Sequence, residues 1–430
     1  MAGHVRKRGT WEFIVDLGDQ PCRRCDDKAC NKRVWDVHAA ECPKCGGTMR
    51  RRVERRQRSQ GGYSTRRDAE RALREAEHAR DRGGLVDPSR VTVADYLRDE
   101  WLTSREPATG GRGHRGQVSL GTWATYRSDL EAHVVPRIGQ IRLQALTGAD
   151  LTRLYDELER SGGRRGQGLS PKTVSNVHGA LHKALADAVR LGRLARNPAD
   201  AVDAPRPDRP PAKVWTVAQL RRFLEHVADD RLYAAWLLFA TTGMRRAEVA
   251  GLAWGDVDLD AGQVRVSWTL GVVDSKTTWK PRPKSKAGER TLALDPATVD
   301  ALRAHRVRHA AERLKFGPGW QATAADWRGQ SRDDVVFTWA DGSPINPQRF
   351  TKWFTNHCHA AGLPAIRLHD VRHTYATAAL ANATGWHEVK VLSQRLGHAS
   401  VGITLDTYSH VLPAADKAQA DTLARVILGG

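Results

Sequence analysis

Four short motifs in the second half of the chain carry residues that could together act on a phosphate ester. Arg245 follows a glycine turn, and His369 and Arg372 are three positions apart. His398 follows a Leu-Gly pair, and Tyr408 comes ten residues later. Breaking a phosphodiester without a metal needs a nucleophile, cations that balance charge on the phosphate oxygens, and an acid for the leaving oxygen. Tyrosine, arginine and histidine can fill these roles, so the motifs indicate phosphoryl transfer.

The local sequence predicts the elements that position these side chains. Arg245 opens a predicted helix, whose exposed N–H groups suit a phosphate, and Glu248 shares its face and could hold the arginine. The i, i+3 spacing puts His369 and Arg372 on one face of another helix. A helix-ending glycine precedes His398 and presents it just beyond the last turn.

Each motif taken alone also has an ordinary structural explanation. Arg245 and Glu248 could form a surface ion pair, and the His-Arg pair could be solvated. A lone tyrosine is usually half-buried packing, because its pKa of about 10 makes it a poor unaided nucleophile. Cations gathered around one phosphate would change that balance for Tyr408.

Taken in order, the motifs resemble the signature of the tyrosine recombinase (phage integrase) family, which shares its catalytic core with type IB topoisomerases. That signature is an Arg in T-G-x-R, a Lys in a β-turn, an H-x-x-R pair, an L-G-H and a Tyr nucleophile. The flanking segments 251–259 and 368–374 match the family as well. The corresponding residues here are Arg245, Lys286, His369, Arg372, His398 and Tyr408.

The resemblance implies a role for each residue. Arg245 and Arg372 would hold the non-bridging oxygens of the scissile phosphate, His398 would hydrogen-bond to that phosphate, and Glu248 would orient the site. The implied enzyme is a site-specific DNA recombinase, an integrase that integrates or excises a mobile element.

The same resemblance implies the path of the protons. His369 would assist proton transfer from Tyr408, which would form a 3′-phosphotyrosine, and Lys286 would protonate the leaving 5′ oxygen. Rejoining to another 5′-hydroxyl would conserve the bond energy, so neither ATP nor a catalytic cofactor would be required.

The lysine assignment leaves alternatives open. Lys284 lies two positions before Lys286, and Lys280 and Lys276 are nearby. The register of a turn lysine ahead of the strand that starts at Arg290 favours Lys286. A solvated basic hairpin would have the same composition.

The chain is predicted to be multidomain, since 430 residues exceed one ordinary core. Residues 212–430 form a mainly helical catalytic domain, with a small β-sheet from segments 264–266 and 291–294 and a buried helix at 232–240. The Pro-rich segment 205–211 is a linker. Residues 89–204 are expected to be all helical and resemble the family's core-binding domain, which with the catalytic domain would form a C-shaped clamp on duplex DNA.

Residues 1–88 are predicted to form a small α+β domain with a strand at 11–17 and a helix at 66–80. The segments 3–11 and 57–66 resemble the arm-type DNA-binding domain of integrases, a three-stranded sheet backed by a helix. An insertion at about 20–48 departs from that pattern.

The insertion holds five of the six cysteines. Two C-x-x-C knuckles, Cys22 with Cys25 and Cys42 with Cys45, predict a zinc ribbon, because four thiolates complete a tetrahedron. Cys30 is then a fifth thiol or a replacement ligand. His38 is a weaker substitute, and a disulfide is the alternative in an oxidising compartment. The zinc would be structural, and Cys358 is predicted to be a helix residue, not a ligand.

The charge balance indicates a nucleic-acid partner. Lys and Arg total 68 against 49 Asp and Glu, a formal net charge of +19. A high-GC genome, rich in Arg codons, would explain the same surplus. No run of about 18 apolar residues occurs, so no membrane partner is expected. Without an apolar segment after the basic N-terminus, a cytoplasmic, nucleoid-associated location in a bacterium is predicted, with reduced cysteines.

The sequence fits more than one arrangement of partners and more than one function. The apolar tail after Tyr408 could pack on a neighbouring protomer, as in the family's tetramers, or on its own domain. A DNA-binding regulator without strand transfer, or a zinc-ribbon adaptor, would fit part of the pattern. The sequence does not tell the DNA target, the choice among integration, excision and resolution, or any accessory proteins.

Overall fold

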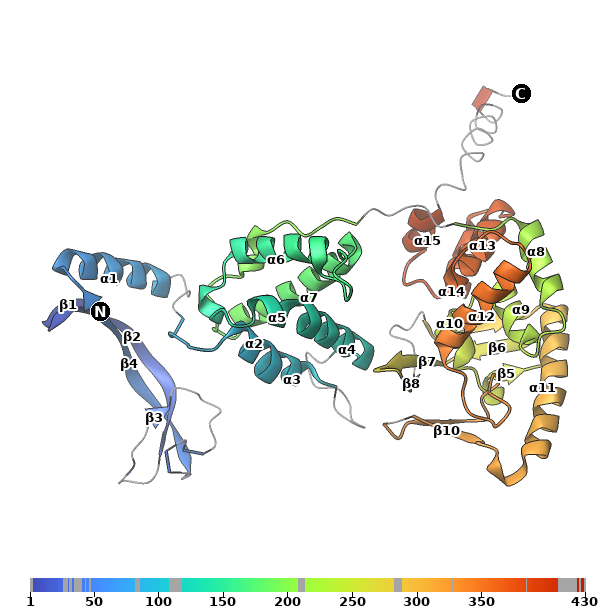
Figure 1. The fold of residues 1–430 in the computed structure, drawn as a ribbon, viewed down its shortest axis with the longest axis horizontal. Helices are drawn as coiled ribbons and strands as arrows, with labels where there is room; N and C mark the ends of the chain where they lie inside the picture. The colour runs from blue at the N-terminus through green and yellow to red at the C-terminus, as the bar shows by residue number, and fades with distance from the viewer. Residues whose placement is uncertain are drawn as a thin grey trace. The chain divides into compact units, whose positions relative to one another are not determined.

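The computed structural model describes residues 3–25, 30, 33–34, 41–42, 44–45, 48–81, 86–107, 118–207, 213–281, 288–326, 328–383, 385–408, 424 and 427–428. The chain divides into two compact units, residues 1–104 with 126–207 and residues 105–125 with 208–430. Figure 1 draws their helices and strands in chain order from blue to red. None of the described helices is both long and apolar enough to cross a membrane.

The N-terminal region is a small antiparallel sheet backed by one helix. Strand β2 pairs with β1, β3 and β4, and α1 follows β4. Phe13 and Val15 of β2 are buried against Leu73 and Ala76 of α1. The predicted strand at 11–17 and helix at 66–80 are therefore present. The elements are β1 His4–Arg8, β2 Thr10–Cys25, β3 Arg33–Val34, β4 Met49–Tyr63 and α1 Arg66–Asp81.

The cysteine insertion is the outer end of the β2–β4 hairpin. Register pairing continues from Trp11↔Tyr63 through Cys22↔Arg52 to Cys25↔Met49. A further antiparallel bridge, Glu41↔Thr48, closes the end of the hairpin. Strands β2 and β4 are thus far longer than the predicted segment 11–17. The prediction stopped there because the alternation of apolar residues ends where the strands extend beyond α1.

The described residues between 86 and 207 are mainly helical, as predicted for 89–204. Local caps begin helices α6 and α7, a Thr147–Asp150 capping box for α6 and Ser170 ahead of Pro171 for α7. Two aromatic side chains hold the first helix to α7, since the Tyr96 hydroxyl donates to the Ala184 carbonyl and the Trp101 indole donates to Asp187. The helices are α2 Val93–Asp95, continuing through Tyr96–Leu102 into α3 Thr103–Arg105; α4 Leu120–Asp129, continuing through Leu130–Val134 into α5 Val135–Ile138; α6 Gly148–Ser161; and α7 Pro171–Arg190.

The larger unit is mainly helical with short β-sheets, also as predicted. Its helices are α8 Val217–His226, α9 Tyr233–Thr242, α10 Arg246–Ala250, α11 Pro296–Phe316, α12 Pro347–Ala360, α13 Leu368–Ala381, α14 Trp386–Leu396 and α15 Val401–Tyr408. Its strands are β5 Val257–Asp258, β6 Gln263–Val266, β7 Trp268–Val273, β8 Lys276–Pro281, β9 Arg290–Ala293, β10 Thr323–Ala325 and β11 Ser331–Asp333. Strands β5, β6 and β9 form one sheet, and β7–β8 and β10–β11 are separate hairpins.

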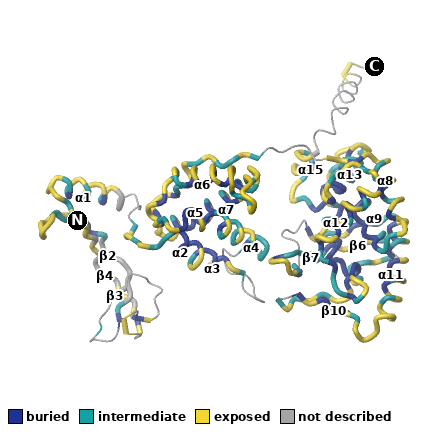
Figure 2. The backbone as a smooth tube through the Cα atoms, viewed as in Figure 1, coloured by how far each residue is buried: buried dark blue, intermediate teal, exposed yellow. Residues whose placement is uncertain are grey.

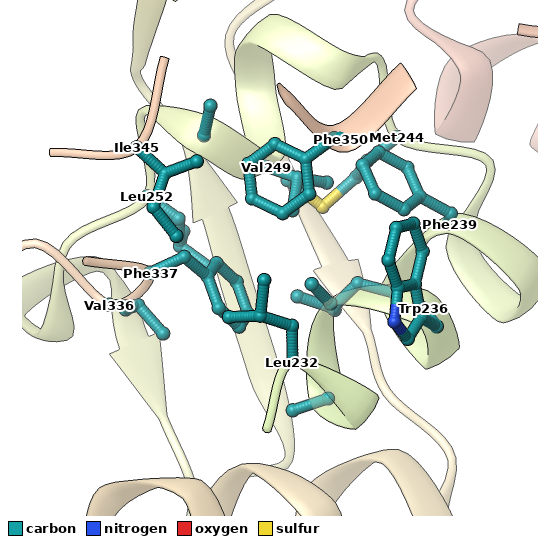
Figure 3. Close-up of a cluster of buried hydrophobic side chains, with 14 of the residues drawn as sticks. Leu232, Trp236, Phe239, Met244, Val249, Leu252, Val336, Phe337, Ile345 and Phe350 are labelled. Atoms are coloured by element: carbon teal, nitrogen blue, oxygen red, sulfur yellow. The ribbon is translucent and has the colours of Figure 1, made fainter. Parts of the chain in front are cut away.

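The core of this unit gathers residues from α9, α12 and β6, where buried positions concentrate (Figure 2). Trp236 and Phe239 of α9 face Phe350 of α12, with Met244 and Val249 beside them (Figure 3). Helix α9 is apolar all round because it is buried all round, which matches the prediction for 232–240. Met244 anchors the turn that precedes Arg245.

The β10–β11 hairpin was not predicted from the sequence. Its position depends on Asp326, which is buried and accepts hydrogen bonds from the Thr278 hydroxyl and the Trp279 N–H of β8. A buried carboxylate that satisfies another strand's donors leaves no periodic signal in its own segment.

Candidate active site

Arg245 emerges from a tight turn after α9. The turn is made by Gly243, whose φ of +64° lies in the left-handed region that glycine adopts without strain. The Arg245 N–H donates to Glu248 Oε2 at 2.8 Å and its Nη1 donates to Oε1 at 2.9 Å. Its Nη2 donates to the Gly397 carbonyl at 3.3 Å. The arginine is thus oriented from two directions while its side chain stays 38% exposed.

Glu248 is a buried carboxylate shared by two arginines. Arg290 donates to Oε1 at 3.1 Å and to Oε2 at 2.9 Å. Burial raises the pKa of Glu248, but the hydrogen bonds and charge of Arg290, with the charge of Arg245, outweigh burial and lower that pKa overall. Glu248 therefore stays ionised between the two guanidinium groups.

Arg290 is the residue of this site that sequence reasoning did not assign. Besides Glu248, its Nε donates to the Arg395 carbonyl at 2.6 Å and its Nη1 to the Gly288 carbonyl at 3.2 Å. It links β9, α10 and the end of α14, and only 7% of its side chain is exposed. The sole sequence signal was its place at the start of the strand after the basic turn.

Arg372 and His369 lie on α13, and both line one cavity with Arg245. Arg372 is buried, and it donates to the Gly243 carbonyl at 2.7 Å and to the Leu396 carbonyl. The imidazole of His369 reaches solvent, but loss of hydration beside packed protein, with the charges of His373 and Arg372, lowers its pKa to about 4. His369 is therefore neutral near pH 7.

His398 follows Gly397, which ends α14 in the left-handed conformation at φ +66°, as predicted. Its Nδ1 lies 2.8 Å from the hydroxyl of Thr404. Burial, together with the charges of Arg372 and Arg245, lowers the pKa of His398 to about 4. Thr404 is fully buried on α15, one helical turn before Tyr408, so His398 is tied to the helix that carries the predicted nucleophile.

The structure does not describe the side chains of two predicted catalytic residues, Tyr408 and Lys286. Tyr408 is the last residue of α15, and its side chain lies outside the described residues. Lys286 belongs to residues 282–287, which also lie outside them. The structure thus brings Arg245, His369, Arg372 and His398 together and does not test the lysine assignment.

The arrangement is an anion pocket. A cavity of about 430 Å³ is bordered by Arg245, His369 and Arg372. Guanidinium groups present planar pairs of donors that match phosphate oxygens, and a neutral histidine at the rim can accept a proton. These groups suit the electrostatic and acid–base demands of phosphodiester exchange.

Four cysteine thiols form a second cluster, at the end of the β2–β4 hairpin. The sulfur atoms of Cys25, Cys30, Cys42 and Cys45 lie within 4.8 Å of one another. Cys25 Sγ is 3.5 Å from Cys45 Sγ, and Cys30 Sγ is 3.7 Å from Cys42 Sγ. Thiolates about 2.3 Å from a tetrahedral zinc would be about 3.8 Å apart, so these thiols fit zinc.

The fourth member of this cluster is Cys30, where the sequence favoured Cys22. The Cys22 side chain lies outside the described residues, so its prediction as a ligand is not tested. The described cysteines form no disulfide. Cys358 is a buried residue of α12, as predicted, and burial raises the pKa of its thiol to about 12.

Comparisons with known proteins place the chain near integrases and tyrosine recombinases. Residues 213–414 match the phage integrase family. The chain is 28% identical over 362 residues to a XerC-like tyrosine recombinase of Caldanaerobacter subterraneus, covering 80% of this chain and 85% of that protein. It is 27% identical to the ICEBs1 integrase of Bacillus subtilis, covering 68% and 75%.

The fold is also similar to that of a solved structure. The Tn1549 transposon integrase in complex with transposon right-end DNA superposes with a TM-score of 0.60 at 22% identity, covering 77% of this chain and 99% of that one. At this identity the likeness concerns the fold.

Proposed function

The chain belongs to the phage integrase family of tyrosine recombinases, and from this premise we propose that it cuts and rejoins duplex DNA at specific sites of a mobile element through Tyr408. The observation that carries the proposal is the convergence of Arg245, Arg372 and His398 from three separate segments beside the helix ending in Tyr408.

In the proposed reaction, the Tyr408 hydroxyl attacks the scissile phosphorus as the bond to the 5′ oxygen breaks. The neutral imidazole of His369 accepts the tyrosine proton, and Lys286 donates a proton to the leaving oxygen. Arg245 and Arg372 balance charge on the non-bridging oxygens, since their held guanidinium groups need little reorganisation.

His398 donates a further hydrogen bond to the phosphate while its Nδ1 stays with Thr404. The products are a 3′-phosphotyrosine and a free 5′-hydroxyl. Attack by a different 5′-hydroxyl reverses the step and exchanges strands without ATP. Members of this family need no catalytic cofactor.

Exchange between two duplexes breaks four strands, and each break uses one tyrosine. The proposed working assembly is therefore four copies of the chain on two DNA sites, with DNA-bending or directionality proteins as accessory partners. A chromosomal substrate places the proposed activity at the nucleoid, in the bacterial cytoplasm.

We also propose a structural zinc ion bound by Cys25, Cys30, Cys42 and Cys45, in place of the set with Cys22. The support is the spacing of the four thiols and the small buried cluster that Cys25, Cys30 and Cys42 form with Met49. A bound zinc would fix the end of the ribbon, which carries the basic residues 50–58.

A covalent adduct tests the enzymatic proposal. The full chain is incubated with genomic DNA that contains the element's junctions, and protein-linked fragments are precipitated with detergent and sequenced. Wild type should enrich one site, and nicked duplexes of that site should trap the adduct. Tyr408→Phe should bind the same duplex and give no adduct. A wild-type chain that shifts DNA without forming any adduct would support the DNA-binding regulator and overturn the proposal.

A further inference from the structure

The pocket holds more positive charge than the assigned catalytic residues account for. Among the described residues that line the 430 Å³ cavity, there is no aspartate or glutamate. The polar and charged lining residues are Arg245, Arg246, Thr351, Arg367, His369 and Arg372.

Carboxylates outside the lining compensate two of these arginines. Arg245 shares the buried Glu248, and Arg367 pairs with Asp370 at 2.7 Å. Arg372 is occupied by backbone carbonyls and belongs to the catalytic set. Arg246 is the remaining arginine of the lining. It has no role in the proposed reaction and no ion pair among the described residues.

Arg246 is held without being neutralised. Its Nη1 donates to the Thr351 hydroxyl of α12 at 2.5 Å. No carboxylate of the described part of the chain forms an ion pair with it. Loss of hydration lowers the pKa of Arg246, yet a guanidinium remains charged at any physiological pH. One of its five N–H donors is engaged by Thr351, and the side chain borders the cavity.

We propose that Arg246, positioned by Thr351, binds the backbone phosphate next to the scissile phosphate on the cleaved strand. Arg245 and Arg246 are successive residues that line one cavity, so a strand that brings one phosphate to Arg245 brings a neighbouring phosphate to the same cavity. A guanidinium group presents a fork of N–H donors that matches phosphate oxygens. This inference rests on the proposed function, because the pocket must receive a DNA strand.

The subsite would hold the strand at the scissile phosphate and at one neighbouring phosphate. Two arginines from adjacent positions would engage two adjacent phosphates, so the strand could not slip by one nucleotide without losing a contact. The role of Arg246 is therefore binding and register, and not bond chemistry.

Salt-dependent binding gives the first test, on the duplex identified by adduct capture. Arg246→Gln should weaken binding about tenfold, because it removes a charge-assisted hydrogen bond. It should also lower the slope of log affinity against log salt by about one, as expected for one phosphate contact. Arg246→Lys should keep the slope and lose part of the affinity. The matched control is Arg303→Gln on α11, which removes an exposed arginine that does not line this cavity.

Neutral phosphates give the decisive test. Duplexes carry a methylphosphonate at the position immediately 5′ or immediately 3′ of the scissile phosphate. One of the two should weaken wild-type binding about tenfold and have no further effect on Arg246→Gln. Additive losses at both positions, or equal behaviour of the Arg246 and Arg303 variants, would overturn the proposal. Wild-type adduct formation on the unmodified duplex tests the proposed function separately.

Discussion

His305 and the two site histidines, His369 and His398, are all neutral in the free protein, for related physical reasons. Each has a pKa lowered to about 4, and the first cause in every case is loss of hydration. For His369 and His398 this leaves an imidazole that can accept a proton at pH 7. A bound phosphate would supply the negative charge that the pocket lacks and would favour protonation of both.

His305 gives a testable pH dependence because it is buried and takes no part in the chemistry. It is 2% exposed, and one ring nitrogen pairs with the Val336 carbonyl at 2.8 Å. Its pKa is about 4 when folded and about 6.5 when unfolded, so the unfolded chain binds more protons between these values. Stability should therefore fall as the pH falls from about 6.5 to 4, by about 3 kcal/mol for this group.

The measurement is hydrogen exchange of α11 amides at pH 7 and pH 4.5, in wild type and His305→Phe. The variant should show a shallower loss of protection as the pH falls. His226→Gln, at an exposed position of α8, should follow wild type. An unchanged slope in His305→Phe would contradict the assignment of a lowered pKa.

Lys286 can be separated from its neighbours by the leaving group. If it protonates the 5′ oxygen, a bridging sulfur at that position should restore cleavage by Lys286→Ala, because a thiolate leaves without a proton. With ordinary DNA we expect a loss of 10²–10⁴-fold (order of magnitude). Single-turnover adduct formation on both substrates measures the effect, with Lys276→Ala as the matched control. If the bridging sulfur restored cleavage by Lys276→Ala and not by Lys286→Ala, the acid for the 5′ oxygen would be Lys276.

At the scale of elements, two left-handed glycines connect the segments of the site. The Gly243 carbonyl accepts from Arg372, and the Gly397 carbonyl accepts from Arg245. Each arginine is therefore oriented by a turn that precedes a different predicted catalytic residue. In the free protein, these backbone acceptors already hold the two arginines of the proposed phosphate pocket.

Gly243→Ala should disable this arrangement. A Cβ there would lie 2.7 Å from the Tyr375 ring and 3.1 Å from Leu396, and the φ of +64° would cost about 1–2 kcal/mol more. Gly262→Ala is the matched control, with φ +61° and no atom closer than 3.7 Å. Thermal unfolding measures the stability of both variants, and single-turnover cleavage measures their activity. Activity should be lost only in the Gly243 variant. Equal effects of the two substitutions would mean that contact with Tyr375 does not matter.

Arg290 should orient the site through Glu248 and should not contact DNA. Arg290→Met leaves Glu248 with Arg245 alone, and breaking a buried pair costs about 3 kcal/mol. Cleavage at saturating DNA should fall more than DNA affinity, and Arg290→Lys should restore part of the rate. Arg265→Gln breaks an exposed pair with Glu289 and should change stability by less than about 1 kcal/mol. A loss confined to DNA affinity would place Arg290 in the DNA interface instead.

The sequence predicts the helices and the motif residues well, because caps and apolar spacing are local. The buried helix at 232–240 and the glycine before His398 are examples. Arg290 and Thr404 could not be assigned, since their partners lie 42 and 6 residues away and depend on tertiary packing. The outer β2–β4 pairing was missed because its strands carry charges and cysteines where sheets usually alternate apolar residues.

At the scale of the whole molecule, the proposed zinc site and the proposed active site belong to different compact units. The cysteine cluster lies in the first unit, and the pocket residues lie in the second. A chelator should therefore release hydrogen-exchange protection at the end of the β2–β4 hairpin and leave α10 and α13 protected. Adduct formation on a short duplex that contains only the cleavage site should persist. Loss of protection in both units would mean that zinc supports the entire fold.

The identity of the zinc ligands is tested by two serine variants. Metal analysis after gel filtration should find one zinc per wild-type chain and none in Cys30→Ser, because three thiolates leave the tetrahedron incomplete. Cys22→Ser, the matched control, should retain the ion. The opposite pattern would return the fourth position to Cys22 and place Cys30 outside the site.

The turns at Gly243 and Gly397 have a practical consequence for retargeting this protein to new DNA sequences. The acceptors that orient both arginines are main-chain oxygens. If the backbone path of either turn changes, a substitution elsewhere cannot replace the lost acceptor. The two smallest residues near the pocket are those that a combinatorial library must keep invariant.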